Sequence, residues 1–252
     1  MKDKSNTMKR SFIITLSIIA PAFAGKRGLG WPADNRNIFS SPQVTFLFNW
    51  GPVNTPQNTE FPFWAMQWGS GGIDELEGDV TSGHPSVIMG FNEPDNESQS
   101  NLSPVDAANL WKENIQPLAG TGAKLISPAI TNGGAPSGTA WLSSFLEECS
   151  GCQIDGVAAH WYGGWTDDFE AFIESLKEFN KPIYLTEFGF SWDEFATTDS
   201  FMQFLPLALD YLDNEPAVEA YAFFGAFHSG TAKDMINADG TLTDIGKLYV
   251  SS

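Results

Sequence analysis

The stretch Pro85-Ser86-Val87-Ile88-Met89-Gly90-Phe91-Asn92-Glu93-Pro94-Asp95 sets an acidic side chain directly after a short apolar run. A run with β-branched members that ends at turn formers is typical of a buried strand, and Glu93 would stand at its carboxyl end, where Pro94 stops it. The stretch Pro182-Ile183-Tyr184-Leu185-Thr186-Glu187-Phe188-Gly189 repeats the pattern around Glu187. Two glutamates presented in this way suggest the paired carboxylates of a glycosidase, whereas either one alone would more often be an ordinary surface acid.

The alternation of strands and helices predicts the fold class. Segments with the length and composition of strands are residues 28–32, 44–51, 63–69, 87–92, 123–129, 154–163, 182–189 and 218–225. Helices are expected at 103–118, 138–148, 167–179 and 200–212, with a closing turn or helix at 242–250. We therefore expect an α/β fold, a single compact (β/α)8 TIM barrel. Its early helices should be reduced, because the first two connections are short and rich in Pro, Asn and Gly.

Residues 1–24 have the form of a secretory signal peptide. Four basic residues precede a mostly apolar stretch at 12–23, and Ala22-Phe23-Ala24 before Gly25 has the small-x-small form of a cleavage site. The apolar stretch is too short for a comfortable membrane span, so an uncleaved anchor is the lesser alternative. We expect a catalytic domain at residues 25–252 in a protein that is secreted, extracellular or associated with the cell wall.

The net charge narrows the range of partners. Residues 1–24 hold four of the 13 Lys and Arg and one of the 31 Asp and Glu, which leaves nine basic and 30 acidic residues and a net charge of −21. So acidic a surface repels phosphate backbones, and nucleic acid and anionic membranes are excluded as partners. A neutral polysaccharide is not repelled, and the chain is expected to act as a monomer.

The two cysteines of the chain are Cys149 and Cys152, in Cys-Ser-Gly-Cys. In a cytosolic protein this spacing would suggest redox chemistry or half of a zinc site. With a signal peptide and no second cysteine pair, a local disulfide is the preferred interpretation.

The reactive groups of a (β/α)8 barrel lie at the carboxyl ends of its strands. Residues expected at these ends or in the loops after them are Trp31, Trp50, Trp68, Asn92, Glu93, His160, Tyr162, Trp165, Glu187 and Trp192. The tryptophans offer flat faces on which pyranose rings stack. Asn92 is placed to hydrogen-bond a ring hydroxyl. His160 and Tyr162, two apart on one strand, point to the same side, where either would hold a carboxylate or tune its pKa.

Each candidate also has a purely structural interpretation. A histidine such as His160, taken alone, is more often a hydrogen-bonded core residue. The tryptophans that fall inside strand or helix patterns are expected in the core, namely Trp64, Trp111, Trp141 and Trp161. No Gly-x-Ser-x-Gly motif supports a serine hydrolase, and three scattered histidines argue against a histidine metal centre. No metal or cofactor is therefore expected, although a calcium ion bound by carboxylates stays open.

Four motifs together resemble the glycoside hydrolase family 128 β-1,3-glucanases, the glycosyl hydrolase catalytic core proteins of fungi and some bacteria. They are residues 26–31 (Lys-Arg-Gly-Leu-Gly-Trp), 90–95 (Gly-Phe-Asn-Glu-Pro-Asp), 160–163 (His-Trp-Tyr-Gly) and 186–189 (Thr-Glu-Phe-Gly). The resemblance covers essentially all of residues 25–252. It implies that Glu93 is the general acid/base, that Glu187 is the nucleophile, that configuration is retained and that no cofactor takes part. It also implies an extracellular or cell-wall setting in a fungus.

The leading hypothesis is a secreted retaining hydrolase of β-1,3-glucan. Asn-Glu-Pro occurs in many barrel glycosidases, so a related hydrolase of β-1,4-mannan or β-1,4-glucan is one alternative. The other alternative is a wall-glucan-binding or elicitor protein that does not hydrolyse its ligand, against which the presence of both glutamates argues.

Overall fold

The computed structural model describes residues 25–30, 36–55, 61–164, 166–191 and 196–251. Its eight strands pair in parallel, in the order β2-β1-β8-β7-β6-β5-β4-β3. They are β1 (Arg27–Gly30), β2 (Val44–Phe48), β3 (Ala65–Met66), β4 (Val87–Met89), β5 (Lys124–Ile130), β6 (Gly156–Gly163), β7 (Ile183–Phe190) and β8 (Val218–Phe223). The expected segments therefore all contain a strand.

The two edge strands of this sheet meet, which closes the barrel. Leu47 on β2 forms a parallel bridge with Phe63, just before β3. Its carbonyl accepts from the amide of Trp64 at 2.9 Å, and its own amide donates to the carbonyl of Pro62 at 3.0 Å. The predicted (β/α)8 barrel is confirmed. Strand β3 is only two residues long, and the amides on either side of it bond to the neighbouring strands, Trp64 to Leu47 on β2 and Gln67 to Met89 on β4.

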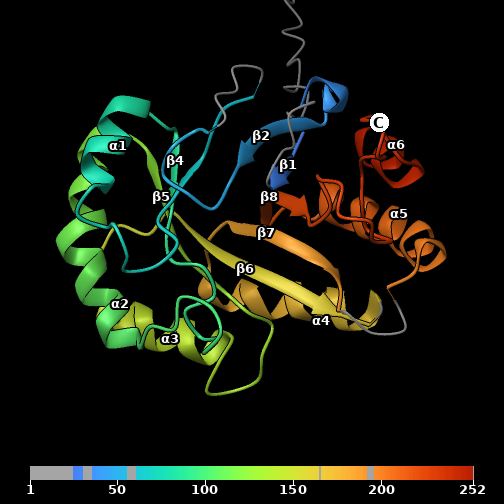
Figure 1. Cartoon of the computed structure of the whole chain (residues 1–252). Helices are drawn as coiled ribbons and strands as arrows, with labels where there is room; N and C mark the ends of the chain where they lie inside the picture. The colour runs from blue at the N-terminus through green and yellow to red at the C-terminus, as the bar shows by residue number, and fades with distance from the viewer. Residues whose placement is uncertain (1–24, 31–35, 56–60, 165, 192–195, 252) are drawn as a thin grey trace, which may run out of the picture.

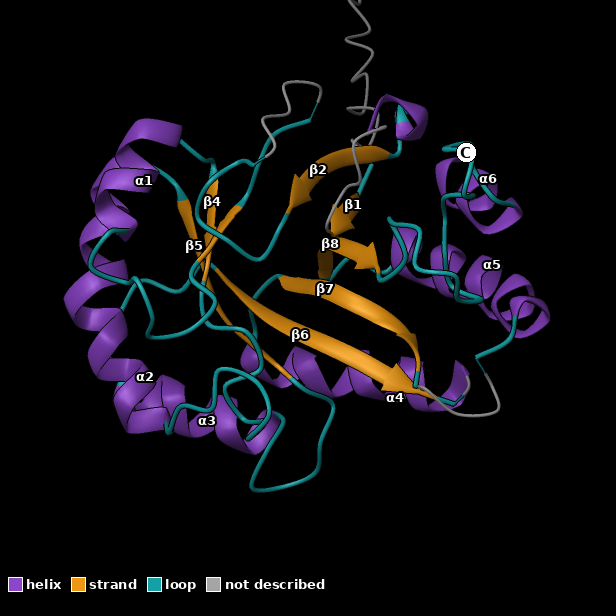
Figure 2. Ribbon diagram, in the orientation of Figure 1, coloured by secondary structure: helices purple, strands orange, loops and turns teal. Residues whose placement is uncertain are grey.

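Helices cover the barrel on all sides except near β2 and β3 (Figures 1 and 2). They are α1 (Leu76–Gly83), α2 (Pro104–Leu110), α3 (Thr139–Glu148), α4 (Thr166–Leu176), α5 (Thr198–Asn214) and α6 (Asp244–Val250). Short turns η1 (Arg36–Phe39), η2 (Trp111–Ile115), η3 (Gln116–Thr121) and η4 (Lys177–Phe179) complete the list. The expected shortage of early helices is confirmed: the described part of the first connection holds only η1. Helix α1 was not predicted, since it is short, contains Gly78 and lacks a side-chain cap.

The core has two layers, one inside the barrel and one between the sheet and its helices. Trp161 points outward from β6 and packs between Phe169 and Phe204, with ring centroids 5.0 and 5.6 Å away. Trp111 and Trp141 are buried as well, so three of the four tryptophans expected in the core are confirmed there. Trp64 is half-buried instead, because it covers the amino-terminal end of the barrel and stacks on Phe46.

Arg27 links β1 to α6 through hydrogen bonds. Arg27 is buried, with 5% of its surface exposed. Its guanidinium donates to the carbonyls of Tyr249 and Ser251 at 2.6 and 2.7 Å. It also donates to Asp213 at 2.7 Å and to the hydroxyl of Tyr221 at 3.0 Å. We call this group of five residues the Arg27 clasp. It fixes the two ends of the described chain beside each other at the amino-terminal end of the barrel.

Cys149 and Cys152 form the predicted disulfide, at the carboxyl end of α3. The two cysteines are only three positions apart, so the bond closes a very small loop. Both cysteines are distant in the sequence from the two glutamates. A loop this small gives little stabilisation in the chain-entropy account of disulfides. The bond is therefore a local feature of one turn.

Candidate active site

Glu93 lies just beyond β4, in a backbone conformation that is rare for a residue with a side chain. The strand ends at Met89 and not, as predicted, beside Pro94; an isolated bridge from Asn92 to Ala129 carries the pairing onward. Glu93 then takes a φ of 41° while its amide donates to the carbonyl of Ala129 at 2.8 Å. Such a conformation costs on the order of 1 kcal/mol or more and persists only when neighbours hold it in place.

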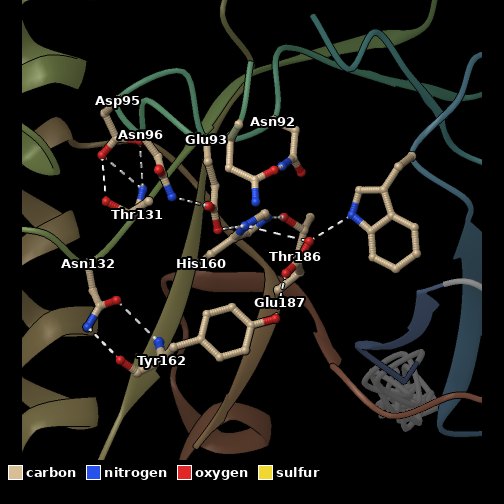
Figure 3. A network of polar contacts seen from close by, with 12 residues as sticks. Asn92, Glu93, Asp95, Asn96, Thr131, Asn132, His160, Tyr162, Thr186 and Glu187 are labelled. Carbon is tan, nitrogen blue, oxygen red and sulfur yellow. Dashed lines mark hydrogen bonds and ion pairs between the residues drawn. The ribbon is translucent and has the colours of Figure 1, made fainter. Parts of the chain in front are cut away.

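The loop after Glu93 is held by Asp95. Its carboxylate accepts from the amide and hydroxyl of Thr131 and from the amide of Gly138 at 2.7–3.1 Å. Asn96 then donates to Glu93 Oε2 at 3.1 Å (Figure 3). The loops after β4 and β5 are thereby joined, and the Glu93 carboxylate points into the mouth of the barrel.

Glu187 reaches the same mouth from β7. The register of β7 against β6 shifts beside it: Ala159 pairs with Leu185 and His160 with Glu187, so Thr186 is the extra residue of a bulge. Bulges re-aim side chains, and this one turns Thr186 and Glu187 toward His160. Glu187 accepts hydrogen bonds from Trp50 Nε1 at 2.7 Å and from the Tyr162 hydroxyl at 2.6 Å.

His160 lies between the two glutamates and is 1% exposed. Its Nδ1 is 2.9 Å from Glu93 Oε1 and 3.6 Å from Glu187 Oε1, while its Nε2 is 3.0 Å from the Thr186 hydroxyl (Figure 3). A hydroxyl both donates and accepts, so Thr186 satisfies Nε2 whether or not that nitrogen carries a proton. The ligand atoms of Glu93, His160 and Glu187 all lie within 4.8 Å of one another, a spacing that a cation would accept, but here the side chains pair with each other.

The electrostatics of the three groups are coupled. Burial acts most strongly on Glu93 and by itself would raise its pKa. The hydrogen bond and charge of His160 and the bond from Asn96 together outweigh burial, so the pKa of Glu93 lies below its usual value. Burial likewise opposes protonation of His160, yet the charges of Glu187 and Glu93 raise its pKa above the ordinary value. Both shifts favour a proton on His160 over a proton on Glu93. Burial, reinforced by Glu187, keeps the pKa of Tyr162 far above its usual value, so this hydroxyl stays a donor.

These shifts predict how folding stability varies with pH. The raised pKa of His160 adds stability below about pH 6.5 that is lost as pH rises through the folded-state value. The lowered pKa of Glu93 adds stability above about pH 4.3 that is lost as pH falls through its folded-state value. His160→Gln should therefore lack the alkaline decline that the wild type shows when urea unfolding is measured from pH 5 to 9. His84→Gln, at an exposed position, is the control and should follow the wild type. Parallel curves for wild type and His160→Gln would contradict this coupling.

Two adjoining cavities flank the glutamates. One, of about 260 Å³, has three aromatic and four polar residues in its lining, namely Trp50, Trp68, Asn92, Glu93, Gln99, Glu187 and Phe224. The other, of about 350 Å³, is lined by Glu93, Asn96, Gln99, Thr131, Asn132, Tyr162, Glu187, Ser191 and Phe224. Carboxylates, amides and flat aromatic faces are the groups through which proteins bind neutral sugars. The arrangement is suited to acid–base work on a polyhydroxylated ligand.

The structure brings together most of the predicted site residues. Trp50, Asn92, Glu93, His160, Tyr162 and Glu187 all line or adjoin the two cavities, and Trp68 lies at the rim with 41% of its surface exposed. Asn92 donates from Nδ2 to Gln99 at 3.2 Å, while its Oδ1 is buried with no hydrogen-bond partner among the described residues, so its predicted bond to a ring hydroxyl stays a prediction. The predictions for Trp31, Trp165 and Trp192 fall outside the described residues.

A family model described as the glycosyl hydrolase catalytic core matches residues 27–249. The structure is similar to a curdlan-specific exo-β-1,3-glucanase of glycoside hydrolase family 128, subgroup III, from Blastomyces gilchristii, with 31% identity, a TM-score of 0.80, and coverage of 91% of this chain and 99% of that one. This chain belongs to glycoside hydrolase family 128. The resemblance inferred from the four sequence motifs is confirmed.

Other relatives in family 128 differ in what they are described as doing. A subgroup II endo-β-1,3-glucanase from Sorangium cellulosum is 30% identical, with a TM-score of 0.76 and coverage of 90% of this chain and 98% of that one. A subgroup VII oligosaccharide-binding protein from Cryptococcus neoformans is 27% identical, with a TM-score of 0.74 and coverage of 90% and 93%. Family 128 thus includes hydrolases and binding proteins.

A longer relative comes from Schizosaccharomyces pombe. Its Alkali-sensitive linkage protein 1 is 32% identical over 245 residues, which cover 90% of this chain and 45% of that protein. The chain therefore spans less than half the length of this relative.

None of the described helices of the family 128 barrel is both long and apolar enough to cross a membrane.

Sequence reasoning missed several residues of this family 128 site. They are Asn96, Gln99, Thr131, Asn132, Thr186, Ser191 and Phe224. Phe224 directly follows β8 and carried the same signal that identified Trp50, an aromatic residue at a strand's carboxyl end. Thr186 directly precedes Glu187 in the sequence, but strict alternation of side chains along β7 would point it away from the site.

Proposed function

We propose that this protein hydrolyses β-1,3-glucan with retention of configuration, with Glu93 as general acid/base and Glu187 as nucleophile. The observation that carries the proposal is the spacing of the two carboxylates, whose facing oxygens lie within 4.8 Å of one another. Retaining glycosidases hold their carboxyl groups about 5–5.5 Å apart, whereas inverting ones leave about 6.5–9.5 Å for a water molecule. The β-1,3-glucanases among its relatives supply the substrate class.

The roles follow from the partners of each glutamate. Glu187 accepts two hydrogen bonds, from Trp50 and Tyr162, which favour its charged, attacking form and fix its direction. His160 Nδ1 lies 2.9 Å from Glu93 Oε1, so a proton carried by His160 can pass along this contact to Glu93, which then protonates the leaving oxygen. Once Glu187 carries the sugar it is neutral, and Glu93, then ionised, takes a proton from the water that releases the product.

The proposal is tested by product analysis. The purified protein should release reducing sugar from laminarin and from laminari-oligosaccharides, but not from β-1,4-mannan or cellulose. The first product, followed by NMR before mutarotation, should be the β-anomer. An α-anomer would contradict retention, and release from mannan or cellulose alone would favour the β-1,4-hydrolase instead.

A second candidate function is glucan binding without hydrolysis. It is favoured by the relatives from Cryptococcus neoformans and Trichoderma gamsii, both described as oligosaccharide-binding proteins. Retention of laminarin by the protein without any release of reducing ends would support it. The complete Glu93–His160–Glu187 group, whose reactive atoms all lie within 4.8 Å of one another, supports hydrolysis.

We further propose that the catalytic domain is residues 25–252 of a secreted monomer, which acts outside the cell or at the cell wall. The support is the leader-like sequence of residues 1–24, with small residues before Gly25. The secreted protein should therefore begin at Gly25 when its amino terminus is sequenced. Recovery of the protein only from washed membranes, with residues 1–24 still attached, would contradict this.

A further inference from the structure

The aromatic wall between the two cavities rests on a buried lysine. Lys233, in the loop between β8 and α6, is 7% exposed. Its ammonium lies 4.3 Å from the centroid of the Phe224 ring and 5.7 Å from that of Phe227. Lys233 lines neither of the two cavities, whereas Phe224 lines both. The cation therefore supports the Phe224 ring from behind.

Phe224 in turn packs against the two residues that bind Glu187. Its ring meets Trp50 and Tyr162 edge-on, with centroids 5.9 and 5.8 Å away. These are the side chains that donate to the two oxygens of Glu187. A shift of Phe224 would remove packing from both donors at once.

The loop is built to hold Lys233 in this place. The carboxylate of Asp234 accepts from the amides of Ser229 and Gly230 at 2.6 and 2.7 Å, and from the Thr231 hydroxyl at 2.9 Å. The carbonyl of Lys233 passes so close to Gly225 that a Cβ atom there would lie 2.3 Å from it. The loop thus folds back tightly over the end of β8.

From this geometry we propose that Lys233 is a positioning residue for the sugar site, and that its ammonium orients Phe224 through a cation–π contact. The proposal deepens the proposed function and rests on it for the choice of ligand. A cation over an aromatic face attracts the ring most strongly where water is excluded, as it is here.

The charge of Lys233 makes this support dependent on pH. Burial lowers the pKa of Lys233 to about 8, although the charges of Asp234 and Glu187 act to raise it. The ammonium is present below that pH and lost above it. Across the Phe224 ring, Tyr162 stays protonated because its pKa is raised well above its usual value. His228, whose Nδ1 is 3.3 Å from Asp234, and Asp239 are further titratable groups of this loop.

The test is a double-mutant cycle on binding. All variants carry Glu93→Gln, which blocks turnover, and the affinity for laminarihexaose is measured by calorimetry. The measurement therefore does not depend on whether the wild type hydrolyses this ligand. At pH 7, Lys233→Met should weaken binding roughly 5- to 30-fold when Phe224 is present. It should weaken binding less than about twofold in a Phe224→Leu background, because its effect passes through the ring. Equal losses in both backgrounds would overturn the proposal.

The pH profile gives an independent readout. Binding by the parent should weaken as pH rises from 7 to 9.5, while Lys233→Arg, whose guanidinium stays charged, should weaken less over that range. Should Lys233→Met fail to fold, this comparison decides alone: a decline in Lys233→Arg equal to that of the parent refutes the role.

A spectroscopic test separates this proposal from the proposed function. In protein labelled with ¹³C-lysine, the Hε–Cε signal of Lys233 should be recognisable because the Phe224 ring shifts its proton frequency upfield. The same signal should titrate near pH 8. The upfield shift should disappear in Phe224→Leu. If laminarihexaose does not bind at all, the proposed function fails, but this resonance still tests the contact: a Lys233 signal unaffected by Phe224→Leu overturns it.

Discussion

Glu187→Ala should lower kcat/KM on laminari-oligosaccharides by on the order of 10⁵-fold, the scale seen when a nucleophile is removed from a site whose groups act together. Without this carboxylate no covalent intermediate forms, whatever the leaving group. With 2,4-dinitrophenyl β-laminaribioside, azide should fill the space left by the side chain and attack the anomeric carbon directly. The glycosyl azide formed should have the inverted, α configuration.

Glu93→Ala should behave differently on the same substrate. Dinitrophenolate leaves without a proton, so attack by Glu187 should persist and the intermediate should accumulate. Azide, which needs no general base, should then release a glycosyl azide of retained, β configuration. Glu113→Ala, on an exposed part of η2 away from the site, is the control and should keep full activity.

The stereochemistry of the azide products decides the roles. A β-azide from Glu187→Ala together with an α-azide from Glu93→Ala would reverse the assignment of acid and nucleophile. If neither variant lost activity on laminarin, the two carboxylates would not be the reacting groups.

Arg27→Met should produce the largest loss of folding stability, about 3–5 kcal/mol in the free energy of unfolding measured in urea. The substitution leaves the carbonyls of Tyr249 and Ser251 and part of the Asp213 carboxylate without the guanidinium that binds them. The buried Tyr249 carbonyl then carries the full penalty of lost hydration, whereas water can in part replace the guanidinium at Ser251 and Asp213, which are partly exposed.

Lys124→Met is the matched control for the Arg27 clasp. Lys124 pairs with Glu219 at 2.9 Å, but the two side chains are 51% and 48% exposed. Exposed pairs contribute about 0.2–1 kcal/mol, so this variant should remain close to the wild type. Equal losses for the two variants would mean that the clasp stabilises the fold no more than a surface ion pair does.

The strands were predictable because their apolar runs and turn residues are local features. That Tyr162 and His160 share a side, and that Trp161 faces the helices, also followed from two-residue alternation along β6. Strand ends were less accurate, since β4 stops at Met89 although its pairing continues to Asn92. Where a strand ends depends on which neighbour's backbone is available, and that is a property of the assembled sheet.

The site was predictable as far as it follows strand geometry. Glu93 and Glu187 were found because each comes after an apolar run. The bulge that turns Thr186 toward His160 depends on the register between β6 and β7, for which the local sequence holds no signal. Lys233 and Asn96 act from loops whose paths are set by Asp234 and Asp95, each through several hydrogen bonds that only the folded chain assembles.

The Arg27 clasp also determines which way the molecule faces when something is attached to it. Gly25 and Ser251 leave the barrel together at its amino-terminal end, whereas the two glutamates lie at its opposite, carboxyl-terminal end. A tether, a bead or a second module joined directly before Gly25 or after Ser251 would therefore start on the side of the barrel opposite the glutamates. The open mouth would still face outward, toward the glucan polymer that we propose as the substrate.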